Sequence, residues 1–209
     1  VSIRPPECRG CALDLQAEGF AQPEGLGSYD VALMGESLGA HEVKDSLPFR
    51  EQAPAGSILQ RAIRLAGLQR EGFTILNSIQ CRPARNWLDG APYEDAAIAH
   101  CKVHRDAYIS KANPKVIVAL GNTALKTLTM FGRGKRRTIM SLRGYPVPAK
   151  DYDALVLPSY HPSFLLPRST KDKGGAGGMK LLGALIFDLK RAVEIARDGL
   201  EVKTPQFLI

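Results

Sequence analysis

Short apolar runs alternate with helical patterns along this chain of 209 residues. A continuous apolar run of five or six residues, bounded by glycine or polar residues, is typical of a strand that is buried on both faces. Four such runs occur, at 30–35, 73–78, 115–121 and 154–159. Between and after them, helices are predicted over about 54–66, 93–112, the residues just after 121, and 179–198. This order predicts a three-layer α/β/α fold with a central four-stranded, mainly parallel sheet.

The chain shows no internal repeat and no internal boundary, so we expect a single domain over residues 1–209. The first predicted strand begins only at residue 30, which leaves an N-terminal segment, 1–29, without a strand of its own. The last helix ends before Gly199, and the tail 199–209 is expected to be loosely held.

The composition favours a globular protein with an anionic partner. The formal net charge is +7, the isoelectric point is near 9.3, and 44% of the residues are hydrophobic. These values exclude disordered and collagen-like classes, but other soluble proteins share them, so nucleic acid is only one candidate partner. No apolar run approaches the roughly 20 residues that span a bilayer, and the opening VSIRPPECRGC has no signal core. We expect a cytoplasmic protein with no membrane association.

Two segments have the composition of a binding site. The loop GESLGAHE, 35–42, follows the first apolar run, and ligands bind at the carboxyl ends of strands in open α/β sheets. An ordinary strand-to-helix turn is the alternative for this loop. The aromatic residue of Pro48-Phe49 is either a stacking platform or part of the core. The basic segment 133–144 either meets phosphates or is simply solvated.

Four cysteines stand at positions 8, 11, 81 and 101. In a reducing compartment they are metal ligands or free thiols rather than disulfides. A redox pair would place Cys8-Arg-Gly-Cys11 at a helix start after a strand, and no strand precedes it. Cys101 shares its helical face with Ala97, His104 and Tyr108, so we expect it to point inward.

Four features, taken together, resemble one family. GESLG resembles a GE-x-PG loop, and Pro48-Phe49 matches the PF that follows it. LNSIQCRP (76–83) resembles N-x-x-KCRP, and SYHPSFLL (159–166) resembles YHP-x-x-LL. The cysteines fall as C-x-x-C, one in the CRP motif and one on the next helix. In this order, over about residues 8–195, the chain resembles the iron–sulfur (family 4) uracil-DNA glycosylases.

The resemblance implies a monofunctional DNA glycosylase that flips out a pyrimidine, uracil above all, and hydrolyses it from the sugar to leave an abasic site. Asn77 would bind the Watson–Crick edge of the base, and Phe49 would stack on it. His161 would stabilise the departing anion with a hydrogen bond. Backbone amides of the loop from Gly35 to Gly39 would hold the base or the attacking water.

Most of the remaining site residues also follow from the matched motifs. Glu36 and Ser37 line the loop, where Ser37 either handles the water or caps a turn. Glu42 matches a family glutamate that walls off the 5-position of the pyrimidine. Ser163 and Arg82, which stand in matched motifs, are expected to contact DNA. Lys135, Arg136 and Arg137 are expected to do so as part of the basic segment, outside the motifs, and a solvated loop is the alternative for them.

The resemblance also assigns the cysteines. Cys8, Cys11, Cys81 and Cys101 would hold a [4Fe–4S] cluster that fastens segment 1–29 and the helix carrying Cys101 to the pocket strand. Structural zinc would use the same four ligands, and only the resemblance decides for iron.

Several positions depart from the family pattern. Ser37 and Leu38 replace a small residue and proline, Val43 replaces an acid, and Gln80 replaces a lysine. Two alternatives therefore stay open beside uracil excision. One is a glycosylase for a bulky 5-modified pyrimidine in viral or modified DNA. The other is a catalytically silent, cluster-containing module that binds DNA. In each case we expect a monomer whose partner is DNA containing uracil or a modified pyrimidine.

Overall fold

The computed structural model describes residues 4–131, 138–166 and 176–200, with only the backbone for 176–179. A five-stranded sheet in the order β2-β1-β3-β5-β4 forms its centre. Four strands run parallel: β1 (Val31–Gly35), β2 (Phe73–Asn77), β3 (Val116–Leu120) and β5 (Leu155–Ser159). The parallel strands confirm the predicted α/β class. The predicted number of four is wrong, because β4 (Val147–Pro148) adds a short antiparallel edge strand.

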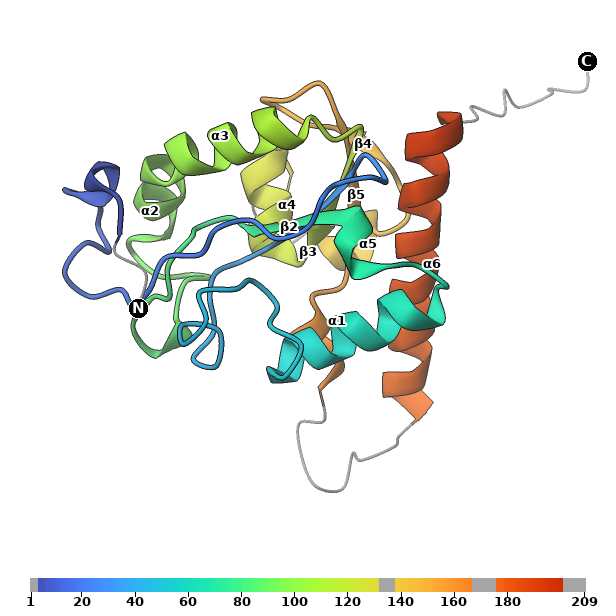
Figure 1. Ribbon diagram of the computed structural model, residues 1–209, viewed down its shortest axis with the longest axis horizontal. Coiled ribbons are helices and arrows are strands. Elements are labelled where there is room, and N and C mark those ends of the chain that lie inside the picture. Colours follow the sequence, from blue (N-terminus) through green and yellow to red (C-terminus); the bar gives the residue numbers. More distant parts are fainter. Residues whose placement is uncertain (1–3, 132–137, 167–175, 201–209) are drawn as a thin grey trace, which may run out of the picture.

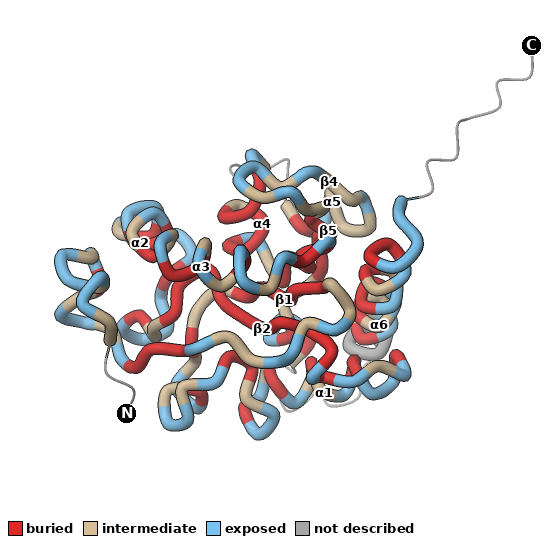
Figure 2. Tube along the Cα trace, turned by 45° about the horizontal axis from the view of Figure 1, so that its top comes forward, coloured by how far each residue is buried: buried red, intermediate tan, exposed pale blue. Residues whose placement is uncertain are grey.

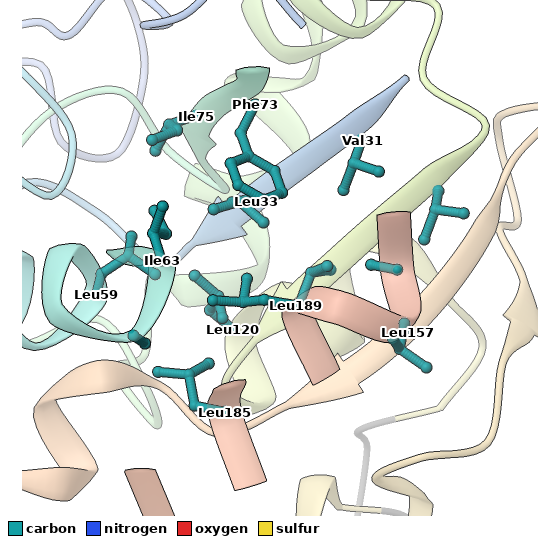
Figure 3. Close-up of a cluster of buried hydrophobic side chains, with 14 of the residues drawn as sticks. Val31, Leu33, Leu59, Ile63, Phe73, Ile75, Leu120, Leu157, Leu185 and Leu189 are labelled. Atoms are coloured by element: carbon teal, nitrogen blue, oxygen red, sulfur yellow. The ribbon is translucent and has the colours of Figure 1, made fainter. Parts of the chain in front are cut away.

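Helices cover both faces of the sheet, which confirms the three layers (Figure 1). Alternate residues of each strand point to opposite faces. On one face the strands pack against α1 (Pro54–Leu65) and α6 (Ala176–Asp198). Figure 3 shows this core, with side chains from the sheet meeting those of the two helices. On the other face they pack against α3 (Lys102–Ala112), α4 (Asn122–Leu128) and α5 (Ile139–Leu142).

The predicted helix over 93–112 is two helices. It is divided by a turn at Cys101 into α2 (Glu94–His100) and α3. The last helix begins at Ala176, slightly before the predicted start. Short 3₁₀ turns connect the elements at Pro6–Cys8, Arg70–Gly72, Ala84–Asn86 and Pro162–Leu165. No helix in the described ranges is both long enough and apolar enough to cross a membrane.

The N-terminal segment runs along the edge of the sheet beside β2 (Figure 1). Glu24 pairs with Ile75 of β2, and Glu18 pairs with Arg82 beyond its end. Between them the Ala21 N–H donates to the Gln80 carbonyl. These bonds fix the N-terminal segment against β2 and the residues that follow it. Along the segment, buried and exposed stretches alternate (Figure 2). Of the predicted tail, only Gly199 and Leu200 lie within the described residues.

Candidate active site

A cavity of about 710 Å³ opens at the carboxyl ends of the parallel strands. Much of its lining comes from residues that follow three strands: Glu36–Gly39 after β1, Gly121–Thr123 after β3, and four residues after β5, Tyr160, His161, Ser163 and Phe164. Parallel strands end at the same edge of a sheet, so these loops meet although they are far apart in sequence. The cavity is at the edge where the motifs predict a site.

His161 lies directly after β5 and lines the cavity. Its Nδ1 accepts a hydrogen bond from the backbone N–H of Ser163 at 3.2 Å and lies 2.7 Å from the Ser163 hydroxyl. A backbone N–H can only donate, so the proton of the neutral ring must be on Nε2. Burial lowers the pKa of His161 to about 4, which keeps the ring neutral at physiological pH.

Gly121 permits this position for His161. A Cβ at Gly121 would lie 3.0 Å from the Cβ of His161, and its φ of +94° lies in the region that favours glycine. The Gly121 N–H also donates to the Ser159 carbonyl at the end of β5. The backbone of the turn after β3 therefore packs directly against the side chain of His161.

Phe49 and Asn77 converge over Gly35. A Cβ at Gly35 would lie 2.5 Å from Cζ of Phe49 and 2.6 Å from Oδ1 of Asn77. The Phe49 ring lines the cavity, and its centre is 5.4 Å from that of the His161 ring. Asn77 is 1% exposed and lies just behind the cavity wall. Among the described residues its Nδ2 has no hydrogen-bond partner, which is costly for a buried donor. The structure thus brings together the three residues expected to hold a base.

The three remaining residues predicted in the first loop differ in their surroundings. Glu36 lines the cavity and accepts a 2.8 Å hydrogen bond from the Thr123 hydroxyl. Burial raises the pKa of Glu36. Ser37 lines the cavity without being fully buried. Glu42 also lines it, but its carboxylate accepts from the backbone N–H groups of Gly39, Phe49 and Arg50. Burial raises the pKa of Glu42 as well, against these hydrogen bonds.

The residues predicted to contact DNA are only partly placed. Ser163 is exposed at the cavity, where it contacts His161. The guanidinium of Arg82 contacts the Glu18 carboxylate and Asn86. Lys135, Arg136 and Arg137 lie outside the described residues. Contact with DNA stays a prediction for all five.

Several cavity residues were not predicted from the sequence. Asn86 and Asp89 reach the cavity from the segment after the CRP motif, and Thr138, Ile139 and Met140 reach it from the start of α5. None of these positions belongs to a recognisable motif. A carboxylate such as Asp89 at a cavity is a signal only once the fold is known.

The four cysteines line a second, apolar cavity between the N-terminal segment, α2 and α3. Cys8 and Cys11 come from the first turn of the chain, Cys81 from the segment after β2, and Cys101 from the turn between the two helices. The Gln80 N–H donates to Sγ of Cys101 at 3.4 Å. His104 has Nε2 3.5 Å from Sγ of Cys8. The predicted set of thiols therefore meets in one place.

Burial makes three of these thiols poor anions in the absence of a cation. It raises the pKa of Cys81 to about 12 and that of Cys101 to about 11, and it also raises the pKa of Cys8. Within the described part of the chain, no three His, Cys, Asp or Glu side chains are placed to hold a single metal ion. Zinc would draw four thiolates to about 2.3 Å from one centre, whereas a cluster holds them farther apart around its edges.

Comparison with known proteins shows the family of the chain. The sequence model of the family described as the uracil DNA glycosylase superfamily matches residues 24–176. The chain belongs to the uracil DNA glycosylase superfamily. It is similar to the type-4 uracil-DNA glycosylase of Thermotoga maritima, at 37% identity over 79% of this chain and 81% of that protein. The type-4 uracil-DNA glycosylases of Sulfurisphaera tokodaii and Saccharolobus solfataricus are each 31% identical, over 76% and 77% of this chain and 71% and 73% of theirs.

The part of the chain that matches the uracil DNA glycosylase superfamily contains both the strands of the sheet and the cavity at their ends. The matched residues 24–176 include β1 to β5 and all lining residues of the larger cavity. The first two cysteines precede this range, so the superfamily match does not extend to the whole thiol set.

Proposed function

We propose that this protein is a monofunctional DNA glycosylase that excises uracil from DNA by hydrolysis and leaves an abasic site. The proposal is carried by one observation: Phe49 and a neutral His161 meet at one cavity, and Asn77 lies beside Phe49 just behind its wall. It is supported by superfamily membership and by relatives named as type-4 uracil-DNA glycosylases. The DNA substrate is further favoured by the net charge of +7.

A flipped uracil has a planar face and a polar edge, and the site offers a surface for each. Phe49 supplies a buried aromatic ring for stacking, worth about 1–3 kcal/mol per base. Asn77 supplies an amide whose unpaired Nδ2 would be satisfied by a carbonyl of the base. A donor that is left unpaired in the empty site gains a partner only when a base is present, which favours binding of the flipped nucleotide.

The leaving group is the uracil anion, so charge develops on a base oxygen as the glycosidic bond breaks. The Nε2–H of His161 is the group of this loop that can donate to that oxygen, because Nδ1 is occupied by Ser163. Aligned donors of this kind typically contribute about 10²–10³ in rate. The neutral ring donates without first losing or gaining a proton.

Glu36 and Ser37 lie beside these residues, where the attacking water would approach the sugar. The Glu36 carboxylate accepts from the Thr123 hydroxyl and from the backbone N–H of Asp89, and these two bonds fix its orientation at the cavity. We propose that Glu36 positions this water and that Ser37 caps the turn.

The thiol cavity fits a [4Fe–4S] cluster held by Cys8, Cys11, Cys81 and Cys101. Burial raises the pKa of the Cys8, Cys81 and Cys101 thiols, so a cation is needed to stabilise their anions, and all four cysteines line the same apolar cavity. The cluster would supply charge compensation and a covalent link between the N-terminal segment and the turn at Cys101. Leu88, Ile79 and Ala97 pack around the same cysteines and link them to the segment that carries Asn86 and Asp89 to the active site.

Base release from matched oligonucleotides tests the function. Duplexes carrying uracil, thymine or a bulky 5-substituted cytosine at one position are incubated with the protein, and abasic sites are read as alkali-labile breaks. We expect breaks at uracil only. Breaks only at the bulky base would assign a modified pyrimidine as substrate. DNA binding without any break would refute catalysis and favour the binding module.

A further inference from the structure

Phe49 has a backbone conformation that is unusual for its residue type. Its φ is +50°, in the left-handed region where a bulky side chain crowds its own backbone. Strained residues persist only where the surroundings hold them, and they gather at functional sites. Phe49 is also 3% exposed, with its ring facing Gly35 and His161. Something in the fold must therefore hold this turn.

Arg70 holds the turn from its carbonyl side. Nη2 of Arg70 donates to the carbonyl of Pro48 and to the carbonyl of Phe49, each at 3.0 Å. The guanidinium is 4% exposed and is oriented by Glu24, with Nε 2.9 Å from Oε1 and Nη2 2.7 Å from Oε2. Nη2 of Arg70 thus shares its two N–H groups among one Glu24 oxygen and the carbonyls of Pro48 and Phe49, whereas the buried Nη1 has no partner among the described residues.

Glu42 and Gly56 hold the turn from the other sides. The Glu42 carboxylate accepts from the N–H groups of Phe49 and Arg50, as well as from that of Gly39. At the start of α1, a Cβ on Gly56 would lie 1.9 Å from the Arg50 carbonyl and 2.5 Å from that of Phe49. The turn is therefore confined by a cation, an anion and a helix backbone.

We propose that Arg70 is a positioning residue for base excision, and that it acts by fixing the strained turn that aims the Phe49 ring at the base. The inference rests on the proposed function and adds a residue outside the cavity to it. Lysine does not replace arginine here, because its single ammonium nitrogen loses the two-point contact that Nε and Nη2 make with the Glu24 carboxylate, and this contact orients the donor toward the two carbonyls. Without the clamp, the turn relaxes toward negative φ and the ring moves away from Gly35.

A double-mutant cycle between Arg70 and Phe49 tests the proposal. Single-turnover release of uracil is measured for Arg70→Lys, Phe49→Ala and the double variant, together with affinity for uracil-containing DNA. We expect Arg70→Lys to lower the rate constant by about 10- to 100-fold, as a small misplacement does. In the Phe49→Ala background the same change should cost less than about twofold, because there is no ring left to position.

Equal losses in both backgrounds, or a wild-type rate in Arg70→Lys, would overturn the proposal. If Arg70→Lys does not fold, Glu24→Ala is a less disruptive test. It removes the carboxylate that orients the Arg70 guanidinium, while both carbonyl contacts of Nη2 stay possible. It should lose rate several-fold, and only when Phe49 is present. Arg191→Lys is the matched control, because Arg191 donates to the Gly144 carbonyl from α6. It should show no coupling to Phe49.

Amide hydrogen exchange separates this inference from the proposed function. The N–H groups of Phe49 and Arg50 are protected by Glu42, and loosening of the turn should speed their exchange in Arg70→Lys while β3 stays protected. If the wild-type protein releases no uracil, the proposed function fails and this measurement alone decides on the clamp. Unchanged exchange at Phe49 and Arg50 would then overturn the role of Arg70.

Discussion

The pH dependence of uracil release tests which form of His161 acts. Burial lowers the pKa of this ring to about 4, and the Ser163 N–H holds Nδ1 as an acceptor. At pH 7 the pH exceeds this pKa by about three units, so only about one ring in a thousand carries a second proton. The neutral ring, with its proton on Nε2, should therefore be the active form.

The assay is the single-turnover rate of uracil release between pH 4.5 and 8.5, with the enzyme in excess. A neutral ring predicts a level rate down to about pH 5 and a decline toward about pH 4. A requirement for the charged ring predicts instead a rate that falls about tenfold for each pH unit above 4. His161→Asn removes the titrating group and should lower the rate by about 10²–10³.

Two controls accompany this profile. Glu36→Gln removes one of the two cavity carboxylates, Glu36 and Glu42, whose raised pKa could shape the acid limb. The melting temperature at each pH monitors the fold. Between pH 6.5, the ordinary pKa of histidine, and the folded pKa of about 4, His161 binds a proton more readily in the unfolded chain than in the folded one. The stability of the fold should therefore decrease as the pH drops through this range. A tenfold fall per unit above pH 5 would refute the neutral ring as the active form. An acid limb near 6.5 that disappears in His161→Asn would refute the lowered pKa of His161.

Three further predictions concern packing and ligands. Gly35→Ala places a methyl group against the Phe49 ring and should reduce the rate of uracil release by at least about 10²-fold. Gly183→Ala is the control: a Cβ there has nothing within 4 Å, so the rate should stay unchanged and the stability should rise by about 0.5–1 kcal/mol. Equal rates in the two variants would contradict the close approach at Gly35. Asn77→Leu should abolish release with little change in melting temperature, because the buried Nδ2 has no partner among the described residues; a large loss of stability would assign Asn77 a structural role instead. Cys81→Ser should lose bound iron and its visible absorbance and lower the melting temperature, and a normal iron content would refute its role as a ligand.

The class of the fold and the place of the site were determined by sequence alone. Apolar runs of five or six residues are long enough to predict buried parallel strands, and the motif loops follow those runs at the edge where ligands bind. Superfamily membership could be predicted because three motifs and the cysteine spacing occur in one order. Each of these features involves residues that are close together in the chain, so it can be recognised in a single sequence.

Other features were decided only by the tertiary structure, because they depend on residues that are distant in sequence. The edge strand β4 is two residues long and includes a proline, so no periodicity marks it. The turn at Cys101 interrupts a pattern that predicts one helix. Glu42 was predicted to face the base, yet its carboxylate also binds backbone N–H groups of the Phe49 turn.

Arg70 shows the physical reason most clearly. In the sequence it is one of 28 lysines and arginines, and nothing nearby suggests that it is buried. Only folding brings Glu24, 46 residues away, and the carbonyls of the Phe49 turn around its guanidinium. The sequence alone could indicate which residues are expected to touch a base, because those residues stand in recognisable motifs. The tertiary structure decides which residues hold those groups in place, because burial and hydrogen bonding arise only when separate segments meet.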